Sequence, residues 1–383
     1  MRKILVITGS RAEYGILKPV IEAIKKHPKL KLLLLATGMH VSPLFGCTVR
    51  DIEKDGFKVD FRVHMLLNGD SKESVVRSLA KGITGMTKII IAVKPDIVFV
   101  CGDRSEPFAA AIVAAYLTIP VAHLFGGDSA IGSNIDDSVR HAITKFSHIH
   151  FAATKEHARR IIKLGEDPWR VFITGSPAID LIMHQKKTQK EQTAKRFGLD
   201  LRKPIILAIQ HPTGINSENV EKEMRQTLEA LVELKHQTIL IYPNSDAGSR
   251  GMIRVIKKYE KFPFIRTFKS LPSSEYLNLM SIASVMVGNS SSGIIEAPSF
   301  CLPVVNIGIR QVGRMKAVNV IDVGYNKKDI KGAIVKALFN KNFRMKIKNC
   351  ENPYGDGRAS GRIVKVLSEI KIDKKLLQKK ITY

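Results

Sequence analysis

Short, mostly apolar runs alternate with stretches of helical periodicity along almost the whole chain. A first series of runs occupies residues 3–7, 32–35, 59–67, 96–100, 121–124, 149–153 and 171–173. A second series occupies residues 205–209, 238–241, 264–267, 284–287, 303–307 and 318–323. Continuous apolar runs are typical of strands buried on both faces, and their repeated pairing with helices indicates a doubly wound parallel sheet. The predicted fold class is therefore α/β.

The composition turns polar between residues 180 and 203, where the two series of strands are separated. A chain of 383 residues is long enough for two domains of ordinary size. We therefore predict a first Rossmann-like domain over residues 1–180 and a second over 181–355, facing a cleft. The final helix, within residues 356–383, is expected to pack back on the first domain.

The overall composition predicts a globular protein, with 44% hydrophobic and 25% charged residues. The first ten residues, MRKILVITGS, are interpreted as a first strand and not as a targeting peptide, and no apolar run approaches a membrane span. We expect a cytoplasmic location and no membrane partner. The four cysteines, at 47, 101, 301 and 350, form no close pair, so neither a metal site nor a disulfide framework is predicted.

The formal net charge is +26, which is compatible with nucleic acid, a membrane surface or a phosphorylated ligand as partner. The excess is mostly lysine spread along the chain, with one Trp and no basic motif interleaved with aromatic residues. We therefore do not expect nucleic acid binding, and favour an anionic small ligand.

Charged and glycine-bearing segments fall at the predicted carboxyl ends of the strands, where ligands bind in such sheets. These segments are 9–11, 102–104, 126–128, 210–211, Asn244 and 288–293. No strand is followed by GxGxxG, and GxxxxGK[ST] is absent, so neither a dinucleotide cofactor nor a P-loop nucleotide is expected. The pattern favours a phosphate-bearing substrate.

The stretch from Gly288 to Arg314 has the order strand, Asn-Ser-Ser-Ser-Gly loop, helix. Loop amides, serine hydroxyls and a helix N-terminus can together hold a phosphate. Glu296, expected on the first helical turn, could accept hydrogen bonds from a ribose diol, and Arg310 could reach the same phosphates. The alternative is a serine-rich helix cap with a surface arginine.

Several segments, taken in order, resemble the UDP-N-acetylglucosamine 2-epimerase family, most closely its hydrolysing branch. They are GSRAEYG (9–15), CGDRSEPFAAA (101–111), HLFGGD (123–128), IDDSVRHAITKFSH (135–148), GSPAID (175–180) and GNSSSGIIEAPSF (288–300), followed by NIGIRQVGR. The resemblance extends from about residue 3 to 370. It implies two Rossmann-like domains as in GT-B glycosyltransferases, and a homo-oligomer (dimer or tetramer).

The resemblance also implies a set of site residues. Those carried over for UDP binding are Arg11, Arg104, His211, Asn244, Ser290, Ser291, Glu296 and Arg310. Those carried over for catalysis are Asp103, Asp128, Asp137 and His211, with Arg140 one helical turn after Asp137. Each acid also has a structural interpretation, Asp103 in a turn and Asp137 in a helix cap, and His211 could be a loop histidine.

The implied reaction needs a base that removes the C2 proton and an acid that helps UDP leave. Elimination to 2-acetamidoglucal and addition of water would give N-acetylmannosamine and UDP, with no cofactor. Phe125 stands where many relatives have a glutamate, so Asp128 is the candidate acid. Other departures are Gly15 and Ile309.

Alternative functions remain open. They are a hydrolysing epimerase of UDP-N,N'-diacetylbacillosamine, a non-hydrolysing epimerase, a glycosyltransferase and a non-enzymatic UDP-sugar sensor.

Overall fold

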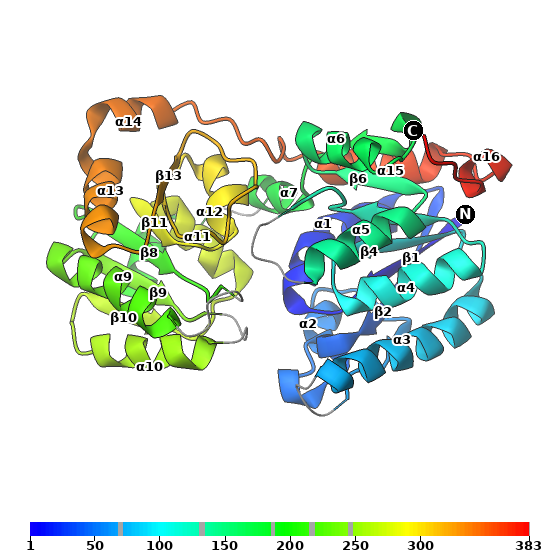
Figure 1. The fold of residues 1–383 in the computed structure, drawn as a ribbon, viewed down its shortest axis with the longest axis horizontal. Helices are drawn as coiled ribbons and strands as arrows, with labels where there is room; N and C mark the ends of the chain where they lie inside the picture. The colour runs from blue at the N-terminus through cyan, green and yellow to red at the C-terminus, as the bar shows by residue number, and fades with distance from the viewer. Residues whose placement is uncertain (68–71, 130–134, 185–187, 214–218, 244–247, 383) are drawn as a thin grey trace. The chain divides into compact units, whose positions relative to one another are not determined.

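The computed structural model describes all residues except 68–71, 130–134, 185–187, 214–218, 244–247 and 383. The chain divides into two compact units. Unit 1 comprises Met1–Asp128, Ile135–Met183 and Tyr354–Tyr383, and unit 2 comprises Ser129–Asn134 and His184–Pro353. Each unit contains one parallel sheet with helices packed on both faces (Figure 1).

The sheet of unit 1 has the strand order β3-β2-β1-β4-β5-β6-β7, and every neighbouring pair is parallel. Its strands are β1 (Arg2–Thr8), β2 (Leu30–Thr37), β3 (Phe61–Val63), β4 (Ile97–Cys101), β5 (Val121–Leu124), β6 (Ile149–Ala152) and β7 (Val171–Ile173). The order reverses between β1 and β4, which are paired through Ile4 and Ile97. This is the Rossmann arrangement, and the reversal defines a switch point at which ligands bind.

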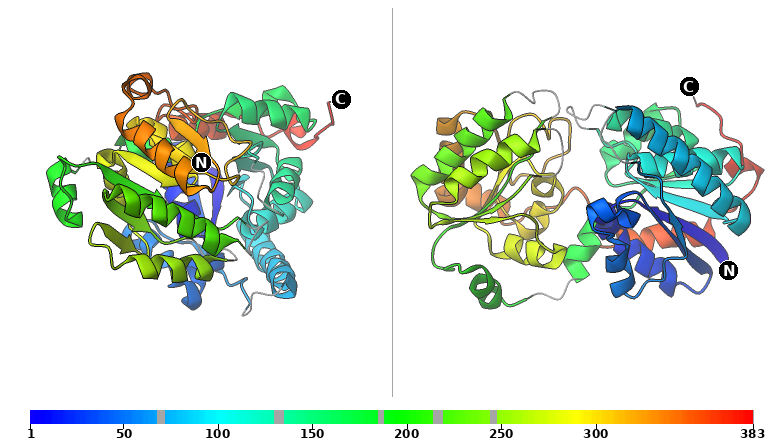
Figure 2. Two further views of the ribbon diagram at one scale, coloured as in Figure 1. Left: turned by 60° about the vertical axis from the view of Figure 1, so that its left-hand side comes forward. Right: turned by 90° about the horizontal axis from the view of Figure 1, so that it is seen from below.

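The sheet of unit 2 repeats this arrangement with the order β10-β9-β8-β11-β12-β13, again all parallel (Figure 2). Its strands are β8 (Ile205–Ile209), β9 (Gln237–Ile241), β10 (Ile265–Phe268), β11 (Val285–Gly288), β12 (Val304–Ile307) and β13 (Val320–Val323). Its switch point lies between β8 and β11, which are in register through Ile206 and Val285. The predicted pair of doubly wound sheets is confirmed.

The helices of unit 1 are α1 (Arg11–Lys26), α2 (Val49–Lys54), α3 (Lys72–Val93), α4 (Ser105–Tyr116), α5 (Asp136–Phe146), α6 (Lys155–Lys163), α7 (Pro177–His184), α15 (Ala359–Glu369) and α16 (Lys374–Leu377). Short 3-10 helices are η1 (Gly38–Val41), η2 (Pro43–Phe45) and η3 (Pro168–Arg170).

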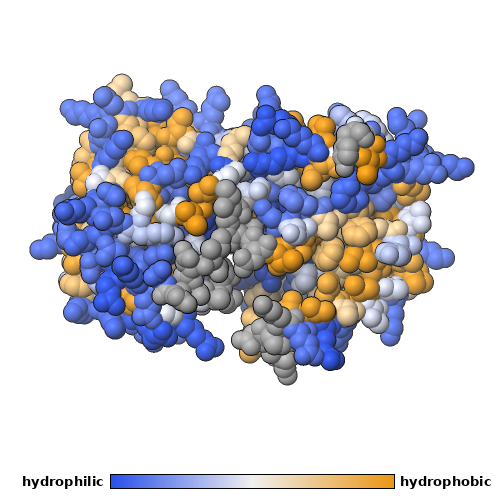
Figure 3. All heavy atoms as spheres, in the orientation of Figure 1, coloured by the Kyte–Doolittle hydropathy of each residue, from blue (hydrophilic) through white to orange (hydrophobic). Residues whose placement is uncertain are grey.

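On the face seen in Figure 3, apolar residues gather over α4 and its neighbours. Val76 of α3 is 66% exposed.

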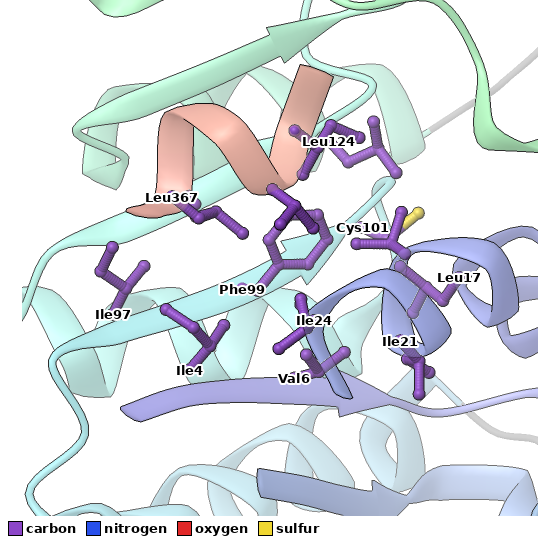
Figure 4. Packing of buried hydrophobic residues seen from close by; sticks show 14 of the residues in the cluster. Ile4, Val6, Leu17, Ile21, Ile24, Ile97, Phe99, Cys101, Leu124 and Leu367 are labelled. Atoms are coloured by element: carbon purple, nitrogen blue, oxygen red, sulfur yellow. The ribbon is translucent and has the colours of Figure 1, made fainter. Parts of the chain in front are cut away.

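Two apolar clusters cover the two faces of the first sheet. One contains Phe99 and Ile4 of the strands together with Ile21 of α1 and Leu367 of α15 (Figure 4). The other contains Val98 and the alanines of α4. Burial of such side chains on both faces explains why the strands are apolar throughout.

The last long helix, α15, belongs to unit 1 and not to the unit that precedes it in the chain. Asp180 of α7 accepts hydrogen bonds from the backbone N–H groups of Ala359 (2.9 Å) and Ser360 (2.7 Å) at the start of α15. Leu367 then packs into the core beside Phe99. The expected return of the C-terminal helix to the first domain is confirmed.

The helices of unit 2 are α8 (Lys190–Phe197), α9 (Val220–Leu234), α10 (Ser249–Tyr259), α11 (Ser273–Ile282), α12 (Ser292–Ile295), α13 (Lys327–Phe339) and α14 (Lys341–Ile347), with the 3-10 helix η4 (Ala297–Phe300). Its core joins Ile206, Val287 and Val305 of the sheet to Leu228 of α9 and Ile334 of α13. Among the described residues, no helix is both long enough and apolar enough to cross a membrane.

Candidate active site

The switch point of unit 1 gathers polar side chains at the carboxyl ends of β1, β4 and β5. Gly9 and Ser10 follow β1, and Ser10 caps α1 by accepting a hydrogen bond from the Glu13 N–H. Asp103 and Arg104 follow β4. Because β1 and β4 are neighbours, the segments that the sequence predicted to meet do lie at adjoining strand ends.

A buried arginine connects two of the three aspartates predicted to be catalytic. The Arg140 guanidinium donates to the Asp103 carboxylate through Nη2 and to Asp137 Oδ1 through Nη1, at 2.5 Å for the latter. The Arg140 side chain is 5% exposed, whereas both aspartates are 24% exposed. The arrangement therefore presents two carboxylates to solvent on one fixed guanidinium.

Asp128 lies beside this cluster, as its carbonyl oxygen accepts a third hydrogen bond from Arg140 Nη1 at 2.9 Å. Its carboxylate lies 3.4 Å from Nε2 of His157, a buried residue of α6. Gly127 makes the tight approach possible, because its φ is +75° and a Cβ there would lie 2.2 Å from the His157 carbonyl oxygen. The sequence did not predict His157, since no local pattern links it to residues 123–128.

His123 supports the loop that carries Asp103. Its Nε2 lies 2.9 Å from the carbonyl oxygen of Gly102, and its Nδ1 lies 3.3 Å from the Thr144 hydroxyl. Burial lowers the pKa of His123 to about 3, so the ring is neutral near pH 7. His123 therefore acts as a structural hydrogen-bonding group beneath Asp103.

Two predicted arginines border the same strand ends. Arg11 is the first residue of α1 and forms a 3.5 Å ion pair with Asp51, with 59% of its side chain exposed. Arg104 precedes α4, and its Nε lies 3.4 Å from Oε2 of the buried Glu106. Both guanidinium groups are accessible enough to bind an anion.

In unit 2, Asn289 joins the loops that follow β8 and β11. Its Oδ1 accepts a hydrogen bond from the His211 N–H at 2.7 Å, and its Nδ2 donates to the His211 carbonyl at 2.9 Å. Gly288 allows this contact, because its φ is +128° and a Cβ would lie 1.9 Å from the Ile209 carbonyl oxygen. Asn289 was part of the predicted loop but was not itself predicted to organise it.

The same asparagine also positions Arg310 after β12. Its backbone carbonyl accepts hydrogen bonds from Arg310 Nη1 at 3.2 Å and from Gln311 Nε2 at 2.8 Å. His211, the serine loop and Arg310 therefore meet around one buried residue. Asn244, the remaining residue predicted for unit 2, lies outside the described residues.

The helix predicted after the serine loop is short. Residues Ser292–Ile295 form a single turn, and a 3-10 turn follows at Ala297–Phe300. Pro298 explains this ending, because a proline disfavours α geometry at the preceding residue and lacks an N–H. Glu296 therefore lies at the junction of the two turns and not on the first turn of a helix.

The hydroxyls of Ser290 and Ser291 remain at the start of this turn, with both residues partly exposed. Ser290 Oγ accepts a weak 3.4 Å hydrogen bond from the Ser292 N–H. Burial raises the pKa of Glu296, and a hydrogen bond associated with Ser292 opposes that shift. The polar groups near this turn include the two serine hydroxyls and the Arg310 guanidinium.

A protein-family model described as UDP-N-acetylglucosamine 2-epimerase matches residues 22–368. The chain belongs to the UDP-N-acetylglucosamine 2-epimerase family. The resemblance that the motifs indicated is thereby confirmed over nearly the whole chain.

Two curated members of this family are each 37% identical to the chain. One is the UDP-N,N'-diacetylbacillosamine 2-epimerase (hydrolyzing) of Legionella pneumophila, aligned over 99% of both chains. The other is the GDP/UDP-N,N'-diacetylbacillosamine 2-epimerase (hydrolyzing) of Campylobacter jejuni, aligned over 86% of both. The solved UDP-GlcNAc 2-epimerase of Neisseria meningitidis, bound to UDP-GlcNAc, superposes with a TM-score of 0.81 over 95% of this chain and 99% of its own. At 22% identity, that superposition establishes the fold.

A metal site is not apparent in the described part of the chain, where no three His, Cys, Asp or Glu side chains are grouped to hold an ion. Within unit 1 the structure groups Asp103, Asp128 and Asp137, and within unit 2 it groups His211, the serine loop and Arg310.

Proposed function

We propose that this protein is a hydrolysing 2-epimerase of a UDP-linked 2-acetamido sugar. The observation that carries the proposal is the pair of partly exposed carboxylates, Asp103 and Asp137, fixed on buried Arg140 at a switch point. Family membership supplies the reaction class, and the two relatives at 37% identity are both named as hydrolysing enzymes.

In the proposed reaction, a carboxylate of the Asp103–Asp137 pair removes the proton from C2 as the bond from C1 to the UDP oxygen breaks. The electron pair of the C2–H bond forms the C1=C2 double bond, and UDP leaves with the electrons of the C1–O bond. Water then adds across the double bond, with hydroxyl at C1 and a proton at C2 on the opposite face. Asp128 is proposed to supply a proton, because Phe125 is apolar and cannot do so.

We assign the nucleotide to the polar loops of unit 2. Ser290, Ser291 and Arg310 would donate to the diphosphate, with His211 nearby. The diol of the ribose would donate to Glu296, whose carboxyl has room for donors since it is only partly exposed.

The sugar is proposed to be the 2,4-diacetamido-2,4,6-trideoxy sugar of UDP-N,N'-diacetylbacillosamine. Both relatives at 37% identity are named for this sugar, and one of them also for its GDP form. UDP-N-acetylglucosamine, which the sequence favoured, is the second candidate because the family description names it. The two sugars differ at C4, acetamido or hydroxyl, and at C6, methyl or hydroxymethyl.

Proton NMR in heavy water tests the reaction and the sugar together. The protein is incubated separately with each of the two UDP sugars, and UDP release and the C2 signal of the free sugar are followed. We expect faster release of UDP from the diacetamido substrate, with the 2-epimer deuterated at C2. A nucleotide-linked epimer would indicate the non-hydrolysing reaction, and faster turnover of UDP-N-acetylglucosamine would reverse the substrate assignment.

Asp103→Asn provides the matched test of the carboxylate. The variant keeps the shape of the side chain but cannot take a proton, so turnover should disappear while UDP affinity stays within about tenfold of wild type. Wild-type turnover by this variant would contradict the role given to Asp103. No turnover and no UDP binding by the wild-type protein would contradict the whole proposal.

A further inference from the structure

Two glutamates that the reaction above does not use are buried beneath the strand ends of unit 1. Glu13 lies in the first turn of α1 and is 7% exposed, and Glu106 lies in the first turn of α4 and is 1% exposed. Charged glutamates are almost never buried to this extent without compensating partners. Their partners therefore show which of the two carries the charge.

Both carboxyl groups lie against the same glycine. Oε2 of Glu13 accepts a hydrogen bond from the Gly9 N–H at 3.1 Å. A Cβ on Gly9 would lie 2.8 Å from Cδ of Glu106, so the Glu106 carboxyl packs directly on the Gly9 backbone. Gly38 closes the same space, because a Cβ there would lie 2.3 Å from Oε1 of Glu106.

Each glutamate has one oxygen with a partner and one without. Oε2 of Glu106 receives the Arg104 guanidinium at 3.4 Å and the Ser105 hydroxyl at 3.2 Å. Oε1 of Glu106 and Oε1 of Glu13 have no hydrogen-bond partner among the described residues, although both are buried. Two buried carboxyl oxygens without donors favour the neutral form of at least one of the two groups, since two charged carboxylates packed on one glycine would repel each other.

A helix-capping role explains only part of this arrangement. Ser10 and Glu13 form a variant of the capping box at the start of α1, in which Ser10 Oγ accepts from the Glu13 N–H and Glu13 reaches back to the N–H of Gly9, the residue before the cap. Such a cap works on the surface as well and does not require a second buried carboxyl. The presence of Glu106 beside Arg104 therefore needs its own explanation.

We propose that Glu13 and Glu106 form a buried carboxyl pair that holds one proton, and that this proton lets Arg104 bind an anionic substrate. Glu106 orients the Arg104 guanidinium, and Glu13 holds the proton. When Glu13 loses its proton, a further negative charge faces the Arg104 guanidinium, and this charge opposes the binding of a phosphate there. Both residues are positioning residues in this scheme.

The electrostatic environment supports this assignment of the proton. Burial, and next the charge of Glu106, raise the pKa of Glu13 to about 8, while the Gly9 N–H and Arg104 oppose the shift. The other titratable groups that face the pair or Arg104 are His40, Cys101 and Asp136. Burial lowers the pKa of His40 to about 4 and raises that of the Cys101 thiol, so both are neutral near pH 7.

The stability of unit 1 tests the shared proton without any substrate. The folded state binds a proton at Glu13 between the unfolded pKa, near 4.5, and about 8, so stability falls as the pH rises through this interval. Glu13→Gln keeps the contact to Gly9 but has no carboxyl group that titrates. The difference in denaturation midpoint between this variant and the wild type should therefore be larger, in favour of the variant, at pH 8 than at pH 5. Trp169, the single tryptophan, reports the unfolding of unit 1 by its fluorescence.

The kinetic test rests on the proposed function. For the wild-type protein, KM for the UDP sugar should rise about tenfold per pH unit above pH 8, with a smaller change in kcat, since Arg104 binds and does not react. Glu13→Gln should abolish this rise. Glu106→Gln should shift the rise of KM to lower pH, because this variant lacks the carboxylate that helps to raise the pKa of Glu13. Glu73→Gln, an exposed glutamate in the first turn of α3, is the control and should behave as wild type.

The outcomes separate this inference from the proposed function. If Glu13→Gln has the wild-type pH dependence of both stability and KM, the shared proton is refuted. If no variant turns over a UDP sugar but the stability profiles differ as expected, the proposed function fails and the carboxyl pair stands. If stability changes as expected while KM stays independent of pH in wild type, the link from the pair to Arg104 is refuted.

Discussion

Replacement of Arg140 by methionine is the most direct test of the proposed catalytic cluster. Arg140 is 4% exposed and donates to Asp103, to Asp137 and to the Asp128 carbonyl. Removing one member of a buried ion pair leaves its partner uncompensated and costs about 3–5 kcal/mol. Arg140→Met leaves two carboxylates without their common cation, so we expect a loss of stability in this range.

Urea denaturation followed by Trp169 fluorescence measures this loss, because the single tryptophan lies in unit 1. Arg159→Met is the matched control, since Arg159 is 65% exposed and pairs with the carboxylate of Glu156 on the same helix, α6. The control should change stability by less than about 1 kcal/mol. Adding Asp137→Asn to Arg140→Met should restore part of the loss, because one of the two uncompensated charges is removed. A loss below about 1 kcal/mol for Arg140→Met would refute the reasoning.

Three further substitutions test other parts of the structure. Asp180→Ala removes the acceptor for the N–H groups of Ala359 and Ser360 at the start of α15. The variant should lose about 3 kcal/mol of unfolding free energy, measured by Trp169 fluorescence, and a loss below about 1 kcal/mol would contradict the role of Asp180 in holding α15. Gly127→Ala should cost about 2–4 kcal/mol, because its Cβ would meet the His157 carbonyl at positive φ, and wild-type stability would contradict this geometry. Arg310→Ala should weaken UDP binding about tenfold or more by calorimetry, and unchanged affinity would remove Arg310 from the nucleotide site.

The strands were predictable from the sequence because both faces of each sheet are covered. Apolar runs such as 205–209 and 121–124 coincide with β8 and β5 residue for residue. Glu296 was predicted on the first turn of the helix after the serine loop, whereas it lies after that turn, between α12 and η4. Local chemistry therefore fixed the type of element well and its extent less well.

The contacts within the candidate site were less predictable, since they join residues far apart in the sequence. Asp137 and Arg140 are one helical turn apart, and their pairing could be expected from the sequence. That Arg140 also binds Asp103 depends on how α5 packs beside the end of β4. His157 and Glu106 have no local pattern that marks them, because their partners Asp128 and Gly9 become neighbours only in the folded unit.

The two switch points have the same backbone geometry but opposite chemistry. In unit 1 the polar groups are mainly carboxylates, and Arg140 is already occupied by Asp103 and Asp137, so it cannot also neutralise a diphosphate. In unit 2 the groups around Asn289 are hydroxyls, amides and the Arg310 guanidinium, which all donate hydrogen bonds. Donors suit an anion and carboxylates suit proton transfer. This difference is the physical reason to assign the nucleotide to unit 2 and the chemistry at C2 to unit 1. It also explains why Arg104, the accessible cation beside the carboxylates of unit 1, would need Glu13 to stay protonated if it is to attract a phosphate.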